Sequence, residues 1–567
     1  MEDDFEGPFG SIAVAEPEPP LEHLGFTEEE YQTTLKVLRS FEKDPERLTH
    51  KTYKDLRGAG IIFTSGITKA YFDGANADEY KANRARKDQR HRAITSLKAK
   101  DRKMREKAAL RQSRIDARAA LILPSSVNFL LEDGKATGKV AEPDLDEEDA
   151  AAAEAEFNAI VRAPGSTDYI ELTFARKCYV CKFPYTRLHF FYDALCPKCA
   201  ELNYQKRMQV TDMKGRVCIV TGGRVKIGYQ IVLKLLRCGA TVIATTRFPN
   251  DSARRYAEEE DFDSFKDRLH IYALDLRDLS AVEQFCAHVL ASYDRLDVIV
   301  NNAAQTVRRP PAYYRHLLEA ESKKSEGRSL LIHDAHAADG QKVKSIEGIG
   351  SVESISQAMA STGSGDTTAT SAALSQLNII EGDDRNDPNE FPEGLLDVNQ
   401  QQIDARAKNS WTMRLDEVTT GELVETTAIN QLSPFVINSR LKPLLIKSPS
   451  ADKYVVNVSA MEGKFYRHKS VFHPHTNMAK AGNNMMTRTS GEDYAKDKIY
   501  MTSVDTGWIT DENPLAKAER RFQTDRWQTP IDEVDAMARV LDPVFRGMVD
   551  GEFLFGVFLK DYNVSDW

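Results

Sequence analysis

The chain has 567 residues and a formal net charge of −10. This length exceeds what one hydrophobic core can organise and predicts two to four domains. The acidic balance argues against general nucleic-acid binding, and no apolar run reaches the 18 residues that a membrane span requires. The acidic N-terminus lacks the basic start and apolar core of a signal peptide, so we expect a cytoplasmic protein, with the nucleus as an alternative.

The first third of the chain is compositionally uneven. Residues 1–25 are acidic and Pro-rich and are expected to be disordered, and residues 26–165 form a helical, basic region with an acidic linker. Its segment 81–118 has 15 Lys and Arg against 4 Asp and Glu, a pattern typical of a long solvated helix. That helix is either an exposed connector or a contact for a polyanion or an acidic partner.

Two cysteine pairs follow between residues 170 and 210. Cys178 and Cys181 form the first C-x-x-C pair, and Cys196 and Cys199 form the second. Four thiolates delivered in this way can close a tetrahedral Zn²⁺ site without an open position, which predicts a structural zinc ribbon. Four unrelated buried thiols are the alternative, and His189, between the pairs, is a possible substitute ligand or a residue of the intervening hairpin. Seven cysteines in such an arrangement indicate a reducing compartment.

From residue 213 the pattern alternates between strands and helices. The apolar run 217–220, a Gly-rich turn, the helical spacing of Ile227, Ile231 and Leu235, and a second apolar run, 241–244, predict a βαβ unit. Further strands are expected at 269–274, 297–300, 454–458, 499–504 and 554–558, which together predict a doubly wound parallel sheet. A Ser/Thr/Gly-rich and then acidic stretch at about 320–395 is expected to be a low-complexity insertion, mostly disordered or mobile.

Ordered landmarks of this region resemble those of the short-chain dehydrogenase/reductase family. They are Thr221 to Gly228 (TGGRVKIG), Asn301 to Ala304 (NNAA), Asn430, Ser459, Lys480 and Asp505 to Trp508 (DTGW). The resemblance covers residues 213–567 and implies a Rossmann-like sheet, a nicotinamide dinucleotide at the carboxyl ends of the strands, and hydride transfer to or from a carbonyl or alcohol substrate. It also implies a homo-oligomer.

The resemblance assigns cofactor contacts residue by residue. The pyrophosphate is expected at Thr221, Gly222, Arg224, Ile227 and Gly228, with Lys226 in place of the family's middle glycine; the adenine side at Asp275 and Leu276; the ribose region at Asn302, Ala303 and Lys480; and the nicotinamide at Thr506 and Gly507. No acid ends the second strand, where Arg247 stands. An Arg suits a 2′-phosphate, so NADP(H) is preferred over NAD(H), unless Arg247 is only a surface residue.

The catalytic set departs from the family pattern. The family's acid is a Tyr four residues before the Lys, and that position is Thr476 here, whose hydroxyl is far less acidic than a phenol. The expected set is therefore Asn430, Ser459, Thr476 and Lys480, with Tyr466, His473 and His475 in the preceding loop as replacement acids. A different register, with Lys480 an ordinary helix Lys, is the alternative.

Two functions follow from these residues. The first is an NADP(H)-dependent oxidoreductase acting on an unidentified carbonyl or alcohol. The second is a non-catalytic dinucleotide-binding scaffold or sensor, in which the zinc ribbon or the basic helix binds a protein partner.

Overall fold

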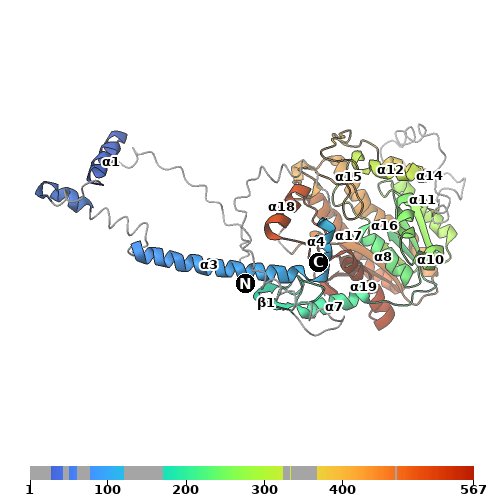
Figure 1. Cartoon of the computed structure of the whole chain (residues 1–567). Coiled ribbons are helices and arrows are strands. Elements are labelled where there is room, and N and C mark those ends of the chain that lie inside the picture. The colour runs from blue at the N-terminus through green and yellow to red at the C-terminus, as the bar shows by residue number, and fades with distance from the viewer. Residues whose placement is uncertain are drawn as a thin grey trace. The chain divides into compact units, whose positions relative to one another are not determined.

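The computed structural model describes residues 27–42, 50–60, 77–119, 170–322, 332–333, 367–466 and 469–567 (Figure 1). The chain divides into two compact units, residues 1–95 and 96–567. The predicted disorder of residues 1–25 and the acidic linker lie outside the described residues. Within the described residues, no helix is long and apolar enough to cross a membrane.

The first unit is helical where it is described. Helix α1 (Glu28–Glu42) begins with a capping box, in which Thr27 and Glu30 exchange hydrogen bonds between side chain and backbone. A 3-10 turn, η3 (Lys51–Tyr53), leads into helical residues 54–60, and the ring of Tyr53 contacts Phe41 at a centroid distance of 5.2 Å. Helix α3 (Ala77–Glu106) then runs across the boundary between the two units.

The basic segment 81–118 is not one solvated helix. It divides into α3 and α4 (Ala109–Ala119), and Met104 and Leu110 are buried in a cluster that also contains residues of the cysteine-bearing region. Arg111, also buried, donates a hydrogen bond to the carbonyl oxygen of Arg526. The prediction of a solvated helix is therefore wrong for residues 101–118, because apolar side chains spaced among the arginines give this part a buried face.

The four cysteines belong to a hairpin–helix unit, here called the cysteine module (residues 170–208). Strands β1 (Ile170–Lys177) and β2 (Pro184–Leu188) pair antiparallel, and the first cysteine pair lies in the turn between them. Helix α7 (Pro197–Met208) carries the second pair, with Cys196 as its N-cap residue. The segment between the two pairs is therefore not a hairpin of its own: it contains β2, which pairs with β1 on the other side of the first cysteine pair, and a loop that leads to α7.

A nine-stranded sheet forms the centre of the second unit, in the order β11-β10-β9-β8-β6-β3-β4-β5-β7. Neighbouring strands are parallel except β10 and β11, which are antiparallel. The strands are β3 (Val217–Thr221), β4 (Thr241–Thr246), β5 (Leu269–Ala273), β6 (Val298–Asn301), β7 (Ile332–His333), β8 (Lys453–Ser459), β9 (Ile499–Asp505), β10 (Val557–Lys560) and β11 (Asn563–Ser565). The predicted doubly wound parallel sheet is confirmed, and β7 and β11 are additions that the sequence did not indicate.

Helices cover both faces of this sheet. On one face, α8 (Lys226–Arg237) and α19 (Glu533–Asp550) pack over a core that includes Cys218 and Val220. On the other, α11 (Leu279–Ser292), α16 (Ser433–Lys447) and α17 (Pro474–Lys496) pack over a core that includes Ile219. Successive residues of β3 therefore pack into the cores on opposite faces of the sheet, which is why residues 217–220 are all apolar.

Part of the predicted insertion is folded. Residues 323–331 and 334–366 lie outside the described residues, but α14 (Thr367–Leu374) and the segment after it pack against the sheet domain. The carboxylate of Asp383 forms a buried two-point ion pair with Arg308, and Phe391 joins a cluster with Phe248. The prediction of a mobile segment is wrong for residues 371–395, because buried ion pairs offset its low apolar content.

Shorter elements connect these layers. They are α9 (Pro249–Ala257), α10 (Phe262–Phe265), η4 (Lys266–Arg268), η5 (Pro311–Tyr314), α12 (Arg315–Ser322), η6 (Ser410–Thr412), η7 (Leu415–Glu417), α15 (Thr420–Thr427), the π-helical turn η8 (Ala428–Leu432), η9 (Met461–Gly463) and α18 (Leu515–Asp525).

Candidate functional site

The turn between β3 and α8 is built so that its backbone closes tightly. Gly222 has a φ of +72°, and a Cβ on Gly228 would lie 2.0 Å from the carbonyl oxygen of Gly222. No side chain fits at residue 228, so the first turn of α8 packs directly on the loop. Lys226 adopts a φ of 53°, which shows that this non-glycine residue takes the left-handed conformation where the resembling family has glycine.

The segment after β6 holds this turn from the other side. The Thr221 hydroxyl accepts hydrogen bonds from the backbone N–H groups of Asn302 and Ala303, each at 3.0 Å. The Asn302 side chain donates to the carbonyl oxygen of Thr221 at 3.0 Å. Free amides at the N-terminus of α8 therefore face a fixed loop, an arrangement that suits a pyrophosphate.

A cleft of about 770 Å³ lies above the carboxyl ends of the strands. It is lined by the segments that follow β3, β4, β5, β6, β8 and β9. Parallel strands end at one edge of the sheet, and ligands of such folds bind there. The predicted cofactor and catalytic residues that line the cleft are Gly222, Arg224, Ile227, Gly228, Arg247, Asp275, Leu276, Asn302, Ala303, Ser459, Lys480, Thr506 and Gly507.

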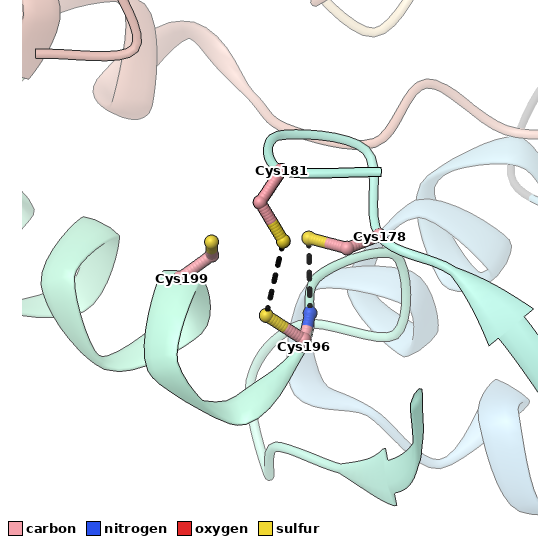
Figure 2. A group of neighbouring side chains, drawn as sticks. All are labelled: Cys178, Cys181, Cys196 and Cys199. Atoms are coloured by element: carbon pink, nitrogen blue, oxygen red, sulfur yellow. Dashed lines mark hydrogen bonds between the residues drawn. The ribbon is translucent and has the colours of Figure 1, made fainter. Parts of the chain in front are cut away.

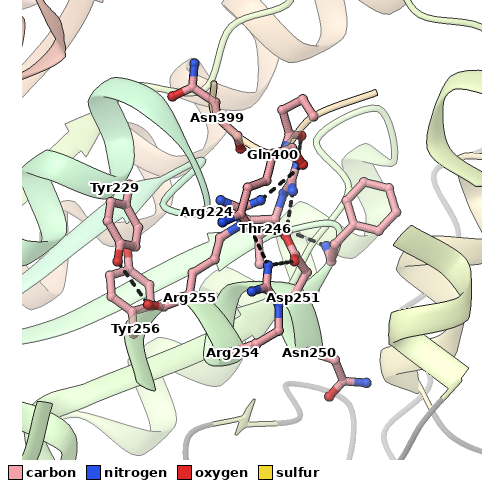
Figure 3. Close-up of polar contacts among 12 residues, drawn as sticks. Arg224, Tyr229, Thr246, Asn250, Asp251, Arg254, Arg255, Tyr256, Asn399 and Gln400 are labelled. Atoms are coloured by element: carbon pink, nitrogen blue, oxygen red, sulfur yellow. Dashed lines mark hydrogen bonds and ion pairs between the residues drawn. The ribbon is translucent and has the colours of Figure 1, made fainter. Parts of the chain in front are cut away.

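The two predicted phosphate-binding arginines have different surroundings. Arg224 is buried, forms an ion pair with Asp251 at 2.7 Å, and donates to Gln401 (Figure 3 shows the Asp251 side of this cluster). Arg254 and Arg255 bind the same Asp251 carboxylate. Asp251 thus neutralises part of the charge of Arg224, whose guanidinium is held in place.

Arg247 lies over aromatic rings instead. Its guanidinium is 4.5 Å from the ring centroid of Tyr314 and 5.5 Å from that of Phe248, and it forms no ion pair with an acidic side chain of the described residues. Burial would raise the pKa of Tyr314, but the guanidinium groups of Arg247 and, to a smaller extent, Arg309 and Arg277 together outweigh it and lower that pKa. The positive charge of Arg247 is therefore presented to the cleft on an aromatic support.

Asp275 is fixed by its own neighbour. Burial would raise the pKa of its carboxyl, but the Arg277 guanidinium, which contacts both carboxylate oxygens, holds it below its usual value. Arg277 also binds Glu425 at 3.0 Å, which ties this edge of the cleft to α15.

The other end of the cleft contains Ser459 and Lys480. The Ser459 hydroxyl donates to Asn484 at 2.7 Å, and the Lys480 ammonium donates to the carbonyl oxygen of Val458 at 2.9 Å. Burial lowers the pKa of Lys480 to about 8, despite the opposing charges of Glu462 and Asp505. The Lys480 ammonium therefore loses its proton at a pH only slightly above neutral, and its side chain lines the cleft.

The predicted acids do not line this cleft. Thr476 is buried in the first turn of α17, and its hydroxyl has no hydrogen-bond partner among the described residues. Tyr466 is 52% exposed, and its ring lies beside the Lys464 ammonium at 4.4 Å. His475 is buried 3.4 Å from Glu422, and His473 stacks on Trp411 at 3.9 Å. None of these four side chains belongs to the described residues that line the cleft.

Asn430 lies in the π-helical turn η8, behind the cleft wall. Its side chain accepts from the backbone N–H of Gln305 at 2.6 Å and donates to the carbonyl oxygen of the same residue at 3.0 Å. Its own carbonyl oxygen accepts from Asn483 at 2.6 Å. Asn430 thus connects the loop after β6 with α17, the helix of Lys480.

The four cysteines converge on one point (Figure 2). Their sulfur atoms all lie within 4.8 Å of one another, and the Sγ atoms of Cys181 and Cys196 are 3.7 Å apart. The backbone N–H of Cys196 donates to Cys178 Sγ at 3.2 Å. A tetrahedral ion with metal–sulfur bonds of about 2.3 Å places its ligands about 3.8 Å apart, so the sulfurs fit such an ion. His189 is not part of the group; it is buried among aromatic rings, and burial lowers its pKa to about 4.

Several cleft residues were not predicted from the sequence. They come from the cysteine module (Tyr179, Lys182), the segment before α15 (Gln401, Trp411) and the loops after β6 and β8 (Arg309, Glu462). Tyr179 and Lys182 are brought there by contacts between segments more than 300 residues apart, for which the sequence contains no local signal.

Comparison with known proteins identifies similar sequences and folds. A family model described as short chain dehydrogenase matches residues 216–319. The uncharacterized protein R665 of Acanthamoeba polyphaga mimivirus is 30% identical over 388 residues, which cover 66% of this chain and 73% of that protein. A fatty acyl-CoA reductase from Acinetobacter baylyi is 29% identical over 100 residues. This match covers 17% of this chain and 32%, about a third, of the reductase.

Among solved structures, a short chain dehydrogenase from Burkholderia cenocepacia in complex with NADP is 16% identical, with a TM-score of 0.37 over 62% of this chain and 97% of that chain. The family-model match, together with the relative matched over most of its length, shows that this chain belongs to the short chain dehydrogenase family.

Proposed function

We propose that the protein is an NADP(H)-dependent oxidoreductase that transfers a hydride between the dinucleotide and a small carbonyl or alcohol substrate. The observation that carries this proposal is a single cleft that joins a glycine-closed phosphate turn at one end to Ser459 and Lys480 at the other. Family membership supplies the reaction class, and the residues of this cleft supply the detail.

The cleft fits a dinucleotide in one orientation. The N-terminus of α8 and Gly222 suit the pyrophosphate, Asp275 and Leu276 the adenine side, and Thr506 with Gly507 the nicotinamide side. The dinucleotide supplies the hydride when it is bound. Thr221 does not line the cleft, and its role is to hold the backbone of Asn302 and Ala303.

The preference for NADP(H) rests on Arg247. The end of β4 offers no carboxylate for a ribose 2′-hydroxyl, and Arg247 presents a cation that forms no ion pair with a described acidic side chain. Arg224, which is paired with Asp251, is assigned a supporting role. A 2′-phosphate at Arg247 gains a charge-assisted hydrogen bond that NAD(H) cannot form.

Lys480 and Ser459 are assigned to the reacting end. The Ser459 hydroxyl can donate to a substrate oxygen once it turns away from Asn484, to which it donates in this structure. Lys480, with a pKa lowered to about 8, can bind the nicotinamide ribose and hold a proton there. Thr476, Tyr466 and Asn430 remain predictions as catalytic residues. Asn430 acts, in this proposal, by positioning α17.

Zn²⁺ is the ion proposed for the four cysteines. Four thiolates at tetrahedral spacing leave no open position, so the ion stabilises the cysteine module and takes no part in the reaction. The homo-oligomer and the cytoplasmic location also remain predictions.

A second function is favoured by one observation. No tyrosine stands four residues before Lys480, and the threonine there is buried and is not among the residues that line the cleft. A scaffold or sensor that binds the dinucleotide without catalysing a reaction would lack the catalytic tyrosine in this way.

The test is NADPH oxidation by purified protein with a panel of aldehydes and ketones. Variants K480A, S459A, Y466F and T476Y are measured beside K442A, a surface lysine paired with Asp493 and remote from the cleft lining. Oxidation that K480A and S459A abolish and K442A leaves unchanged supports the oxidoreductase. Tight NADPH binding without oxidation by any variant except T476Y supports the scaffold.

A further inference from the structure

The cysteine module contributes side chains to the cleft itself. Tyr179 and Lys182 line the cleft, and both belong to the turn that carries Cys178 and Cys181. A module that served only to stabilise the fold would need no contact with the ligand cleft. The position of these two residues therefore calls for a function of the module at the cleft.

Tyr179 lies directly against the turn that follows β9. Its hydroxyl accepts a hydrogen bond from the backbone N–H of Trp508 at 2.8 Å. Gly507 has a φ of +79°, and a Cβ built on it would lie 3.3 Å from the same hydroxyl oxygen. The turn 506–508, whose residues all line the cleft, is thus held by a side chain from another module.

The module also reaches the phosphate turn. Cys178, Leu195 and Ala200 share one hydrophobic cluster with Ile509 and Ile531, which lie beyond the turn 506–508. Ile227, in the first turn of α8, packs against the same cluster. The two backbone turns proposed to hold the pyrophosphate and the nicotinamide side of the dinucleotide therefore share one packing partner.

The position of Tyr179 depends on the cysteine site. It is the residue after Cys178, and its backbone N–H donates to the carbonyl oxygen of Ala194 at 2.9 Å, two residues before Cys196. An ion bound to the four sulfurs would join this turn to the start of α7. Besides it, the backbone bond to Ala194, the N–H···S bond from Cys196 and the Sγ···Sγ contact between Cys181 and Cys196 join the two cysteine pairs among the described residues.

We infer that Tyr179 is a positioning residue through which metal occupancy of the cysteine module controls dinucleotide binding. The bound ion fixes Tyr179, Tyr179 fixes the turn 506–508, and that turn holds the nicotinamide half of the ligand. This inference rests on the proposed function and extends it, because it makes the metal site a control point of the cleft.

The experiment measures NADPH dissociation constants by fluorescence for wild type, Y179F and Y185F, each before and after zinc removal with 1,10-phenanthroline. Y185F is the matched control, since it removes a buried hydroxyl of the same module that donates to Asp193 and not to the cleft. Elemental analysis counts the metal, and hydrogen–deuterium exchange of a peptide containing residues 505–510 reports the turn directly.

In wild type, zinc removal should weaken NADPH binding about two- to tenfold, the value of one hydrogen bond, and speed exchange at residues 505–510. Y179F should keep one zinc per chain, show both changes already, and respond little to zinc removal. Y185F should behave as wild type.

If zinc removal weakens NADPH binding equally in Y179F and in wild type, the inference is overturned. It is also overturned if Y179F has the NADPH affinity and the hydrogen–deuterium exchange at residues 505–510 of wild type. A wild type that holds zinc but binds no dinucleotide would overturn the proposed function together with the inference. A wild type that binds NADPH but holds no metal would overturn the inference alone.

Discussion

Replacing Arg247 by alanine tests the assignment of the adenosine end of the cleft. The guanidinium rests on Tyr314 and Phe248, so its position before binding is already restricted and little side-chain entropy is lost when a 2′-phosphate arrives. A charge-assisted hydrogen bond of this kind contributes about 1.5–3 kcal/mol. At about 1.4 kcal/mol per factor of ten, R247A should weaken NADPH binding about ten- to a hundredfold.

Binding of NADPH and NADH should be measured by fluorescence titration for wild type, R247A and R254A. Arg254 is the matched control, because it lies in the same region but binds Asp251 and Glu258 and does not line the cleft. NADH affinity should change less than twofold in R247A. An equal loss for both dinucleotides would mean that Arg247 supports the fold and does not recognise the 2′-phosphate.

Three further variants test other parts of the structure. G228A should abolish dinucleotide binding while the thermal midpoint falls only modestly, since its Cβ would lie 2.0 Å from the Gly222 carbonyl oxygen and must open the phosphate turn; retained NADPH binding by calorimetry would contradict this. NADPH affinity should fall as pH rises through about 8, where Lys480 loses its proton, and K480R should flatten the profile between pH 7 and 9.5; an unchanged slope in K480R would exclude Lys480 as the titrating group. D383A should lower the free energy of unfolding by about 1.5–3 kcal/mol in urea denaturation, because the buried Arg308 loses its two-point bond to Asp383 and keeps only Glu425 as its ion-pair partner, whereas the exposed-pair variant D493A should change it by less than about 1 kcal/mol.

The sheet and most of the cleft could be predicted because their signals are local. The apolar runs at 217–220 and 241–244 need burial on both faces, which only a covered parallel sheet offers. Residues just after such strands must meet at one edge, which placed Asp275, Asn302 and Ser459 together. Lys226 was identified as the residue at the family's glycine position, and its φ of 53° accords with that assignment.

The features that could not be predicted depend on pairs of distant residues. Arg308 and Asp383 are separated by 75 positions, and the sequence around either residue does not indicate that it pairs with the other. The ion pair folds a segment whose composition alone indicates mobility. Tyr179 and Trp508 are 329 positions apart. The position of Tyr179 between Cys178 and Cys181 does not indicate that its side chain lines the cleft.

The reacting end was only partly predictable. Counting four residues back from Lys480 identified Thr476, but the count could not show that its hydroxyl is buried away from the cleft. Which residues of the first turn of α17 are buried depends on how that helix packs against β9, η9 and α15, which sequence spacing does not determine.

The contact between the cysteine module and α19 joins the middle of the chain to its end. Arg207 binds Asp532 and Asp535, Tyr192 binds Asp535, and Arg539 binds Asn203, with 325 to 343 positions between the partners. At about 5–20 residues per second, a ribosome needs about 15–70 s to add that length of chain. The charged face of the module therefore stays uncovered until α19 has been synthesised.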